Sequence, residues 1–222
     1  FIGTCKHGAV LGSAPFILFL NSDTEAIENG WLDKMLPETD DIGIVGARLL
    51  YPPSIPGFLA GKIQHAGVAR NSKGIPYHPF LGWDANSPEV SKARDVNAVT
   101  GACLLVRRSL WNELGGWDER FGKGVYEDVD LGWRTKKKGL RVLYQPAATL
   151  YHHESASKSP DGNHQLNEHT QENLEQLLKK WNYPGSDEDL FFNADTVKRW
   201  EKANTALKPL IEKLTGNSIS IQ

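Results

Sequence analysis

Two apolar runs of strand length end abruptly in ionisable side chains, and this pattern constrains the fold more than any other. Residues 16–24 read FILFLNSDT and residues 142–157 read VLYQPAATLYHHESAS, so Asp23 follows the first run and His152 and His153 follow the second. Such runs are typical of buried strands, and open α/β sheets bind ligands at the carboxyl ends of their strands. The pattern predicts an α/β fold with a site at these strand ends.

The side chains at these strand ends suit a divalent cation. Carboxylate and imidazole are ligands for Mn²⁺ or Mg²⁺, with substrate phosphates completing the coordination. Each segment also has an ordinary interpretation, because Asn-Ser-Asp after a strand is commonly a turn and paired histidines in a loop are commonly only solvated.

A third segment, GKGVYEDVDLGWR at residues 122–134, places three carboxylates at the start of a predicted helix. Glu127, Asp128 and Asp130 follow two glycines, and the free N–H groups of a helix start favour negative charge. A carboxylate held there can act as a base. The alternative is an ordinary helix with an acidic first turn.

The order of the motifs LNSDT, GARLLY, IQHAGV, VTGACLLVRRSLWNELGGWDERF, YEDVDLGWR and LYHHESAS resembles that of family 2 glycosyltransferases with the GT-A nucleotide-sugar fold. The resemblance covers residues 1 to about 193. It implies a Rossmann-like mixed sheet flanked by helices over residues 1–159 and a helical C-terminal extension over 160–222. The family normally begins with a further strand and turn that receive the nucleotide base. We therefore expect an N-terminally truncated domain, with additional domains in a longer protein.

The resemblance implies a metal and donor site at the first strand end. The family's DxD motif is reduced here to Asn21, Ser22 and Asp23, of which Asp23 matches the metal-binding acid. Asn21 and Ser22 would contact the donor. A histidine completes the metal site, and both His152 and His153 fit that role.

The resemblance also implies a catalytic acid pair. Asp128 matches the general base, and Glu127 would bind the acceptor or orient the base. Arg134 would contact substrate, pair with an acid or simply cover the helix.

Two further loops are expected to contact substrate. Thr100, Gly101 and Ala102 are small enough for a ligand to approach the backbone, and the family places donor-sugar contacts near this turn. Trp117 and Asp118 lie in the loop that faces the acceptor in the family. For Trp117 the alternative is packing of that loop onto the sheet.

The order of further elements can also be predicted. Hydrophobic spacing and turn residues predict helices over 1–14, 24–36, 109–114, 166–181 and 194–214, and strands over 42–50 and 96–107. Between residues 51 and 95 the chain is rich in Pro and Gly. Tyr77, Phe80 and Trp83 in this loop could form a platform for a sugar ring or a small core that holds the loop together.

Composition narrows the partners. With 222 residues, 40% hydrophobic content and a formal net charge of −2, the chain can bury a core and has no long basic block that would track nucleic acid. Cys5 and Cys103 form no disulfide framework, which indicates a reducing compartment. No apolar run is long enough to cross a bilayer. We expect a cytoplasmic protein, associated with membranes only through flanking segments.

These observations predict a metal-dependent glycosyltransferase that moves a sugar from a nucleotide-diphosphate donor to a glycan, lipid-linked or protein hydroxyl. One base opposite the leaving group predicts a single displacement with inversion. Two alternatives stay open. One is a catalytically silent glycan-binding or scaffolding domain, which Asn21 in place of an acid would favour, and the other is a metal-dependent hydrolase.

Overall fold

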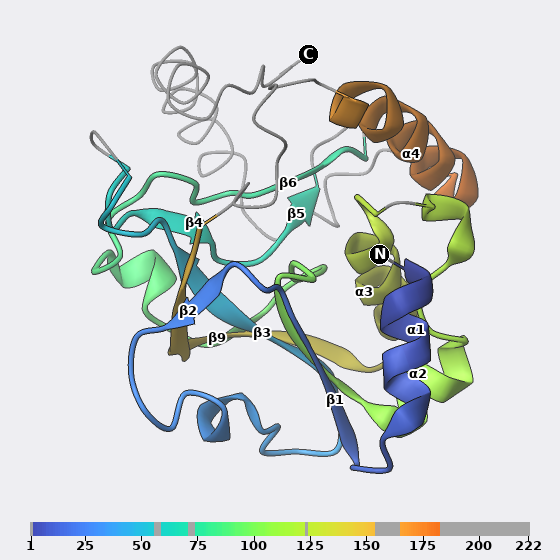
Figure 1. Cartoon of the computed structure of the whole chain (residues 1–222), viewed down its shortest axis with the longest axis horizontal. Coiled ribbons are helices and arrows are strands. Elements are labelled where there is room, and N and C mark those ends of the chain that lie inside the picture. Colours follow the sequence, from blue (N-terminus) through green and yellow to red (C-terminus); the bar gives the residue numbers. More distant parts are fainter. Residues whose placement is uncertain (1, 56–58, 71–73, 123, 154–164, 183–222) are drawn as a thin grey trace.

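The computed structural model describes residues 2–55, 59–70, 74–122, 124–153 and 165–182, the last range with side chains from residue 170 onward. A seven-stranded sheet forms its centre, with the order β1-β8-β3-β9-β2, β4 beside β3 and β7 beside β9 (Figure 1). The strands are β1 (Phe16–Leu20), β2 (Thr24–Ala26), β3 (Ile42–Leu50), β4 (Ile63–His65), β7 (Arg94–Asp95), β8 (Cys103–Arg107) and β9 (Arg141–His152). A small second sheet pairs β5 (Ala69–Arg70) with β6 (Pro76–Tyr77).

The central sheet is mixed, as predicted. β3 and β9 run parallel, whereas the other pairs in the sheet are antiparallel. The helices are α1 (Ile2–Leu11), α2 (Arg108–Leu114), α3 (Glu127–Lys137) and α4 (Gln165–Trp181), with 3₁₀ turns η1 (Asp33–Met35), η2 (Pro88–Val90) and η3 (Glu119–Phe121). In Figure 1, α1, α2 and α3 gather on one side of the sheet, and α4 lies at the upper right.

Alternation along the strands divides the core between the two faces of the sheet. In β8, Leu104 and Val106 pack with the residues of α1, α2 and α3, whereas Cys103 and Leu105 pack on the opposite face with Met35. This is the period of two that a β-strand imposes on its side chains. Because both faces are covered, the strand reads as a continuous apolar run in the sequence.

Helix α4 belongs to the same core. Its Leu177 is fully buried there, and Trp181 packs against that core. The helix predicted over residues 166–181 is confirmed, since α4 covers Gln165–Trp181. It packs on the sheet domain through Leu177 and Trp181. The helix predicted over 194–214 lies outside the described residues.

The helix predicted over residues 24–36 is wrong. Thr24–Ala26 instead forms β2, which pairs with β9, and a single 3₁₀ turn follows at Asp33–Met35. The apolar spacing that predicted a helix is not a buried face, because Ile27 and Leu32 are exposed. Pairing with a distant strand overrides the local pattern here.

The strand predicted over residues 96–107 is correct only from Cys103 onward. Before it, the backbone N–H of Val96 donates to Val142, and the carbonyl of Ala98 accepts from Val68. Val142 and Val68 belong to different parts of the chain, so residues 96–98 cross from one to the other. At residue 102 the chain then reaches the end of β1, where Ala102 bonds Asn21.

Strand register brings the polar strand ends to one edge of the sheet. Leu20 pairs with Cys103, and Thr24 pairs with His152. The backbone N–H of Asn21 donates to the carbonyl of Ala102 at 2.9 Å. The residues that follow β1, precede β8 and end β9 are therefore neighbours.

Candidate active site

The strand ends bring Asp23 and His152 together. Nε2 of His152 lies 3.2 Å from Oδ1 of Asp23, and the two side chains are 13% and 12% exposed. The pairing of Thr24 with His152 brings Asp23 close to the end of β9, and because Asp23 lies in the turn before β2, its side chain can turn toward His152. The carbonyl oxygen of Asp23 also accepts a bond from the backbone N–H of His153.

Gln64, a residue that sequence reasoning missed, fixes the ring of His152. Its Nε2 donates to the carbonyl oxygen of His152 at 3.1 Å, so its Oε1 must be the atom 2.7 Å from Nδ1 of His152. An amide oxygen can only accept, and Nδ1 therefore carries a proton. In the neutral ring Nε2 is left with its lone pair toward Asp23.

Two acceptor atoms thus face each other across 3.2 Å, and a proton or a cation must lie between them. A carboxylate oxygen and an imidazole nitrogen whose other nitrogen is held by a side-chain amide form a usual donor set for a divalent metal. The residues present therefore fit such a cation. Within the described residues, no group of three or more His, Cys, Asp or Glu side chains is placed to hold a metal ion.

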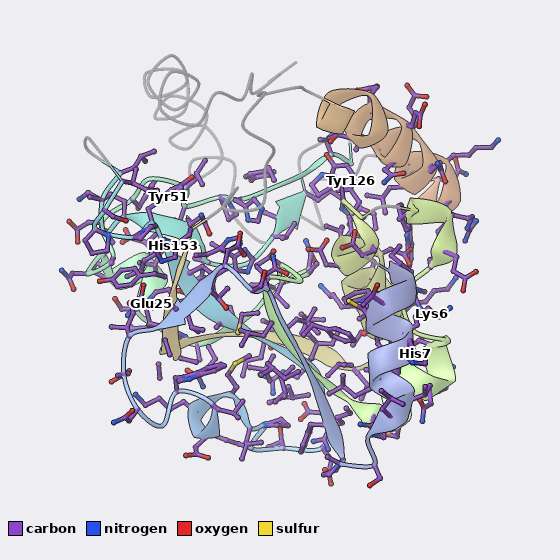
Figure 2. The ribbon with its side chains drawn as sticks, in the orientation of Figure 1. Lys6, His7, Glu25, Tyr51, Tyr126 and His153 are labelled. Carbon is purple, nitrogen blue, oxygen red and sulfur yellow. The ribbon has the colours of Figure 1, made fainter. Side chains whose placement is uncertain are left out.

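His153 points elsewhere. Its Nε2 lies 3.0 Å from Oε2 of Glu25, and both side chains are substantially exposed. Figure 2 shows the two labelled side chains next to each other beside β2. Of the two histidines proposed for the metal, the structure therefore places His152 beside Asp23 and His153 outside this pair.

Asp128 lies in the first turn of α3 and faces the segment before β8. Its Oδ2 accepts from the backbone N–H of Gly101 at 2.8 Å, and its Oδ1 accepts from that of Val129 at 2.8 Å. Burial raises the pKa of Asp128, and the bonds from Gly101, Val129 and the Thr100 hydroxyl oppose that increase. The carboxylate is therefore held in place and is more basic than an exposed aspartate.

Glu127 is almost fully buried beside it, with 5% of its surface exposed. Its Oε2 has no hydrogen-bond partner among the described residues. Burial, followed by the charge of Asp128, raises the pKa of Glu127 to about 8. At neutral pH Glu127 is mainly protonated.

The segment Thr100–Ala102 connects these groups through its backbone. The carbonyl of Ala102 accepts from the N–H of Asn21, two residues before Asp23, and the N–H of Gly101 donates to Asp128. The N–H of Thr100 lies 3.4 Å from Nε2 of His65, the residue after Gln64. The three polar segments singled out in the sequence therefore meet at one edge of the sheet.

The buried His65 and the partly buried His78 form a pair. Nε2 of His65 accepts from the N–H of Gly67 at 3.2 Å, so its Nδ1 carries the proton and donates to Nδ1 of His78 at 3.0 Å. Burial lowers the pKa of His65 well below the usual range and that of His78 to about 4. Both rings are neutral and support the backbone beside the site. In the sequence, only the position of His65 next to Gln64 in one short strand could have indicated that this histidine lies beside the site.

The side chains of three residues proposed to bind substrate, Trp117, Asp118 and Arg134, are engaged in contacts within the protein. Trp117 is 1% exposed and its ring lies against Phe19 and Trp111, which favours the packing interpretation for this residue. Asp118 caps η3 and pairs with Arg120 and Lys180.

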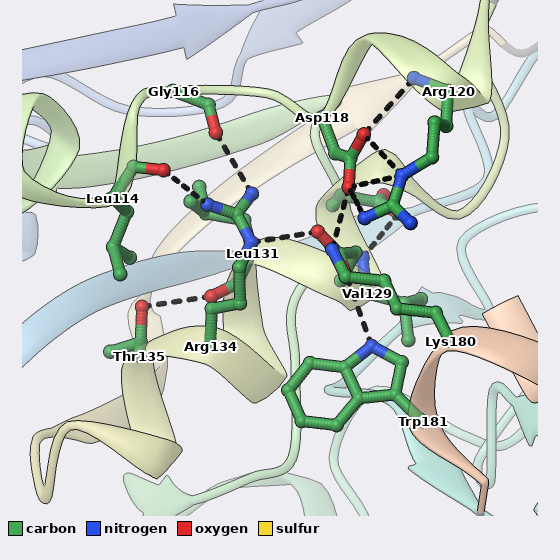
Figure 3. A network of polar contacts seen from close by, with 12 residues as sticks. Leu114, Gly116, Asp118, Arg120, Val129, Leu131, Arg134, Thr135, Lys180 and Trp181 are labelled. Atoms are coloured by element: carbon green, nitrogen blue, oxygen red, sulfur yellow. Dashed lines mark hydrogen bonds and ion pairs between the residues drawn. The ribbon is translucent and has the colours of Figure 1, made fainter.

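Arg134 is likewise occupied. It pairs with Asp130 at 2.7 Å and donates to the carbonyls of Leu114 and Gly116 (Figure 3). Its guanidinium joins α3 to the loop after α2, which is a structural role.

The aromatic residues of the 51–95 region show the same preference for packing. Phe80 is buried in the main core, and Trp83 stacks edge-on against it at a centroid distance of 5.1 Å. The interpretation as a small core that holds the loop is thus favoured over a sugar platform for these two rings.

None of the helices in the described ranges combines the length and apolar character that a membrane crossing requires.

Comparison with known proteins agrees with this architecture. The sequence profile of glycosyltransferase-like family 2 matches residues 78–179. The O-antigen biosynthesis protein RfbC of Myxococcus xanthus is 37% identical over 158 residues, which are 67% of this chain and 12% of RfbC. The N-acetylglucosaminyl-diphospho-decaprenol L-rhamnosyltransferase of Mycobacterium tuberculosis is 46% identical over 68 residues, which are 31% of this chain and 22% of that protein. The chain thus spans less than a quarter of the length of these two relatives.

The fold has a counterpart among solved structures. The crystal structure of GalNAc-T7 with UDP, GalNAc and Mn²⁺ superposes with a TM-score of 0.59 at 14% identity, over 97% of this chain and 44% of that one. At this identity the likeness concerns the fold alone. By its profile match and its 37% identity with RfbC over 67% of its own length, this chain belongs to the family 2 glycosyltransferases.

Proposed function

We propose that this chain carries the reaction centre of a metal-dependent, inverting glycosyltransferase. The donor is a nucleotide-diphosphate sugar and the acceptor is a hydroxyl of a glycan, a lipid-linked glycan or a protein. The observation that carries the proposal is the convergence of the Asp23–His152 pair and Asp128 on the two ends of the segment Thr100–Ala102.

The names of the similar proteins support the two substrate classes. The rhamnosyltransferase is named for an N-acetylglucosaminyl-diphospho-decaprenol acceptor, and a second relative, 30% identical over 145 residues, is a pre-mycofactocin glycosyltransferase. GalNAc-T7 was crystallised with UDP and Mn²⁺. A lipid-linked hydroxyl is therefore the acceptor class that the name of the rhamnosyltransferase favours.

Asp23 and His152 would hold the cation, Mn²⁺ or Mg²⁺. A bound divalent cation neutralises the charge that develops on a departing diphosphate. Asp23 would supply a carboxylate oxygen, and His152 would supply Nε2, because the bond from Nδ1 to Gln64 selects the neutral tautomer with its lone pair on Nε2. Asn21 and Ser22 lie in the turn that orients Asp23, where the carbonyl of Asn21 accepts from the hydroxyl of Thr24 at 2.7 Å.

Asp128 would remove the proton from the acceptor hydroxyl. Its oxygens accept from the backbone N–H groups of Gly101 and Val129 and from the Thr100 hydroxyl, and these bonds hold the carboxylate in a fixed orientation. Its raised pKa makes it a better base near neutral pH than an exposed aspartate. A single base with no separate nucleophile corresponds to one in-line displacement, which inverts the anomeric centre.

Calorimetry with Mn²⁺ and a panel of nucleoside diphosphates tests the proposal. We expect nucleotide binding to require Mn²⁺, to weaken at least tenfold in Asp23→Ala, and to persist in Asp128→Asn, because Asp23 would contact the cation and Asp128 would not. Nucleotide binding that is independent of metal, or unchanged in Asp23→Ala, would contradict the metal assignment.

The same titrations separate the two alternatives. Binding of free glycans without any nucleotide would support a glycan-binding module, and Mn²⁺ binding indifferent to nucleotide would support a hydrolase.

NMR of the transfer product should show the anomeric configuration opposite to that of the donor. Retention would exclude the single displacement.

A further inference from the structure

We infer that Asn173 of α4 is a positioning residue for the catalytic acid pair, because it holds the loop before α3 in the conformation that presents Glu127 and Asp128. This inference rests on the proposed function of Asp128 as base and assigns a part in that function to a helix far along the chain.

Asn173 makes a concentrated set of contacts with this loop. Its Nδ2 lies 2.7 Å from the carbonyl oxygen of Gly124, 3.0 Å from that of Phe121 and 3.2 Å from that of Val125. The residue is 6% exposed. An amide nitrogen has two protons, so one of them is shared between two carbonyls. Three acceptors around one nitrogen require a donor at this position, which aspartate or alanine cannot provide.

The loop needs this support because its backbone is sterically unfavourable. Gly124, Val125 and Tyr126 have φ angles of 113°, 74° and 73°. Two consecutive non-glycine residues with positive φ are uncommon, and a β-branched valine there is an outlier. Such conformations persist only where surrounding contacts fix them, and they cluster at functional sites.

The strained residues lead directly into the acid pair. Tyr126 is the residue before α3, its side chain makes no capping bond, and its carbonyl accepts from the N–H of Asp130 at 2.9 Å. Glu127 and Asp128 follow at once. If Val125 and Tyr126 relaxed to negative φ, the first turn of α3 would rotate, and Asp128 would lose its bond from Gly101.

Helix α4 is fixed independently of Asn173. Leu177 is fully buried in the main core, and Nε1 of Trp181 donates to Asp130 at 2.9 Å. Lys180 pairs with Asp118 at 2.7 Å and with Asp130 at 2.5 Å. Figure 3 shows how Lys180 and Trp181 reach the network around α3. Loss of the Asn173 amide should therefore release the loop without detaching the helix.

Steady-state kinetics of Asn173→Ala in the protein test this inference. We expect kcat to fall at least tenfold while the donor KM and the Mn²⁺ affinity stay within twofold. Asp23 and His152, the proposed metal ligands, lie before β2 and at the end of β9 and not on α3 or α4. Two control variants change α4 at other positions: Gln171→Ala removes an exposed amide, and Leu177→Ala removes core packing. At a temperature where all variants are folded, both should retain most of kcat.

A second-site variant separates positioning from general destabilisation. Glycine adopts positive φ without a Cβ clash. Adding Val125→Gly to Asn173→Ala should therefore restore part of kcat, although it adds no contact. A merely structural role for Asn173 predicts no recovery.

The outcomes distinguish the two proposals. If the wild-type protein transfers sugar and Asn173→Ala retains its kcat, or loses no more than the Leu177→Ala control, the positioning role is wrong and the proposed function stands. If the wild-type protein shows no metal-dependent donor binding, the proposed function fails first. Should Asn173→Ala not fold, Asn173→Gln keeps an amide but displaces it by one methylene, and an unchanged kcat in that variant would overturn the inference equally.

Discussion

The Oδ2 atom of Asp128 accepts a hydrogen bond from the backbone N–H of Gly101 at 2.8 Å. This bond joins the start of α3 to a segment whose next residue, Ala102, binds the turn that carries Asp23. The proposed proton acceptor and the proposed cation-binding pair, from three distant parts of the chain, are thereby held in one region.

Asp128→Asn should reduce kcat by a factor on the order of 10² to 10⁴, because it removes the proton acceptor. Donor binding, measured by calorimetry with Mn²⁺, should stay nearly unchanged. The asparagine oxygen can still accept from Gly101, so α3 should keep its place. Unchanged turnover would exclude Asp128 as the base.

Gln64→Leu should weaken Mn²⁺ binding by roughly 10- to 100-fold, because residues that orient a metal-binding histidine have effects of that size. The leucine can neither accept from Nδ1 of His152 nor donate to its carbonyl. Titration of Mn²⁺ by electron paramagnetic resonance measures this directly, without turnover. The matched control is Gln145→Leu, since Gln145 lies in β9 and contacts only the N–H of Ala147 through its side-chain oxygen. Equal Mn²⁺ affinity in wild type and Gln64→Leu would show that His152 needs no such support.

Glu127→Gln should change how stability depends on pH. The pKa of Glu127 is raised from 4.5 to about 8 in the folded protein, so the native state holds a proton that the unfolded state has released between these values. Stability should therefore fall as pH rises through this window and level off above about 8.

The glutamine variant has no such proton to lose. Its free energy of unfolding should exceed that of wild type by a margin that grows from pH 5 to pH 8, by at most about 4 kcal/mol at 1.36 kcal/mol per pKa unit. Urea denaturation at several pH values measures the difference. A margin that stays constant with pH would mean that Glu127 is ionised in the native state.

Gly132→Ala should displace α3. A Cβ atom at this position would lie 2.6 Å from Cβ of Ala98 and 2.9 Å from the carbonyl oxygen of Asn97, so backbone must move. Overpacking of this kind costs about 1 to 3 kcal/mol, which outweighs the roughly 1 kcal/mol that alanine gains over glycine in a helix. The shift would also move Asp128, so kcat should fall.

The matched control is Gly8→Ala in α1, where a Cβ would meet nothing within 4 Å. That variant should be as stable as wild type or slightly more stable, by thermal denaturation. Equal stability of Gly132→Ala and Gly8→Ala would contradict the close approach of α3 to residues 97–98.

The sequence alone determined the elements whose signal lies in neighbouring residues. The apolar runs at Phe16–Leu20 and Ile42–Leu50 are strands at those residues, and the acidic first turn of α3 begins at Glu127. The order of these motifs indicated the family and the mixed α/β fold. Local composition suffices for such features, because burial on both faces and helix capping leave their pattern within a few positions.

Tertiary structure decided which residues meet. The turn between β1 and β2 places Asp23 beside His152 and leaves His153 beside Glu25, and neither contact can be read from two adjacent histidines in a sequence. The pairing of β2 with β9 replaced the helix predicted over 24–36. Gln64 lies 88 positions from His152, and Asn173 lies 49 positions from Gly124. No periodicity marks contacts of that separation, because they depend on how the folded elements pack and not on which residues adjoin them in the chain.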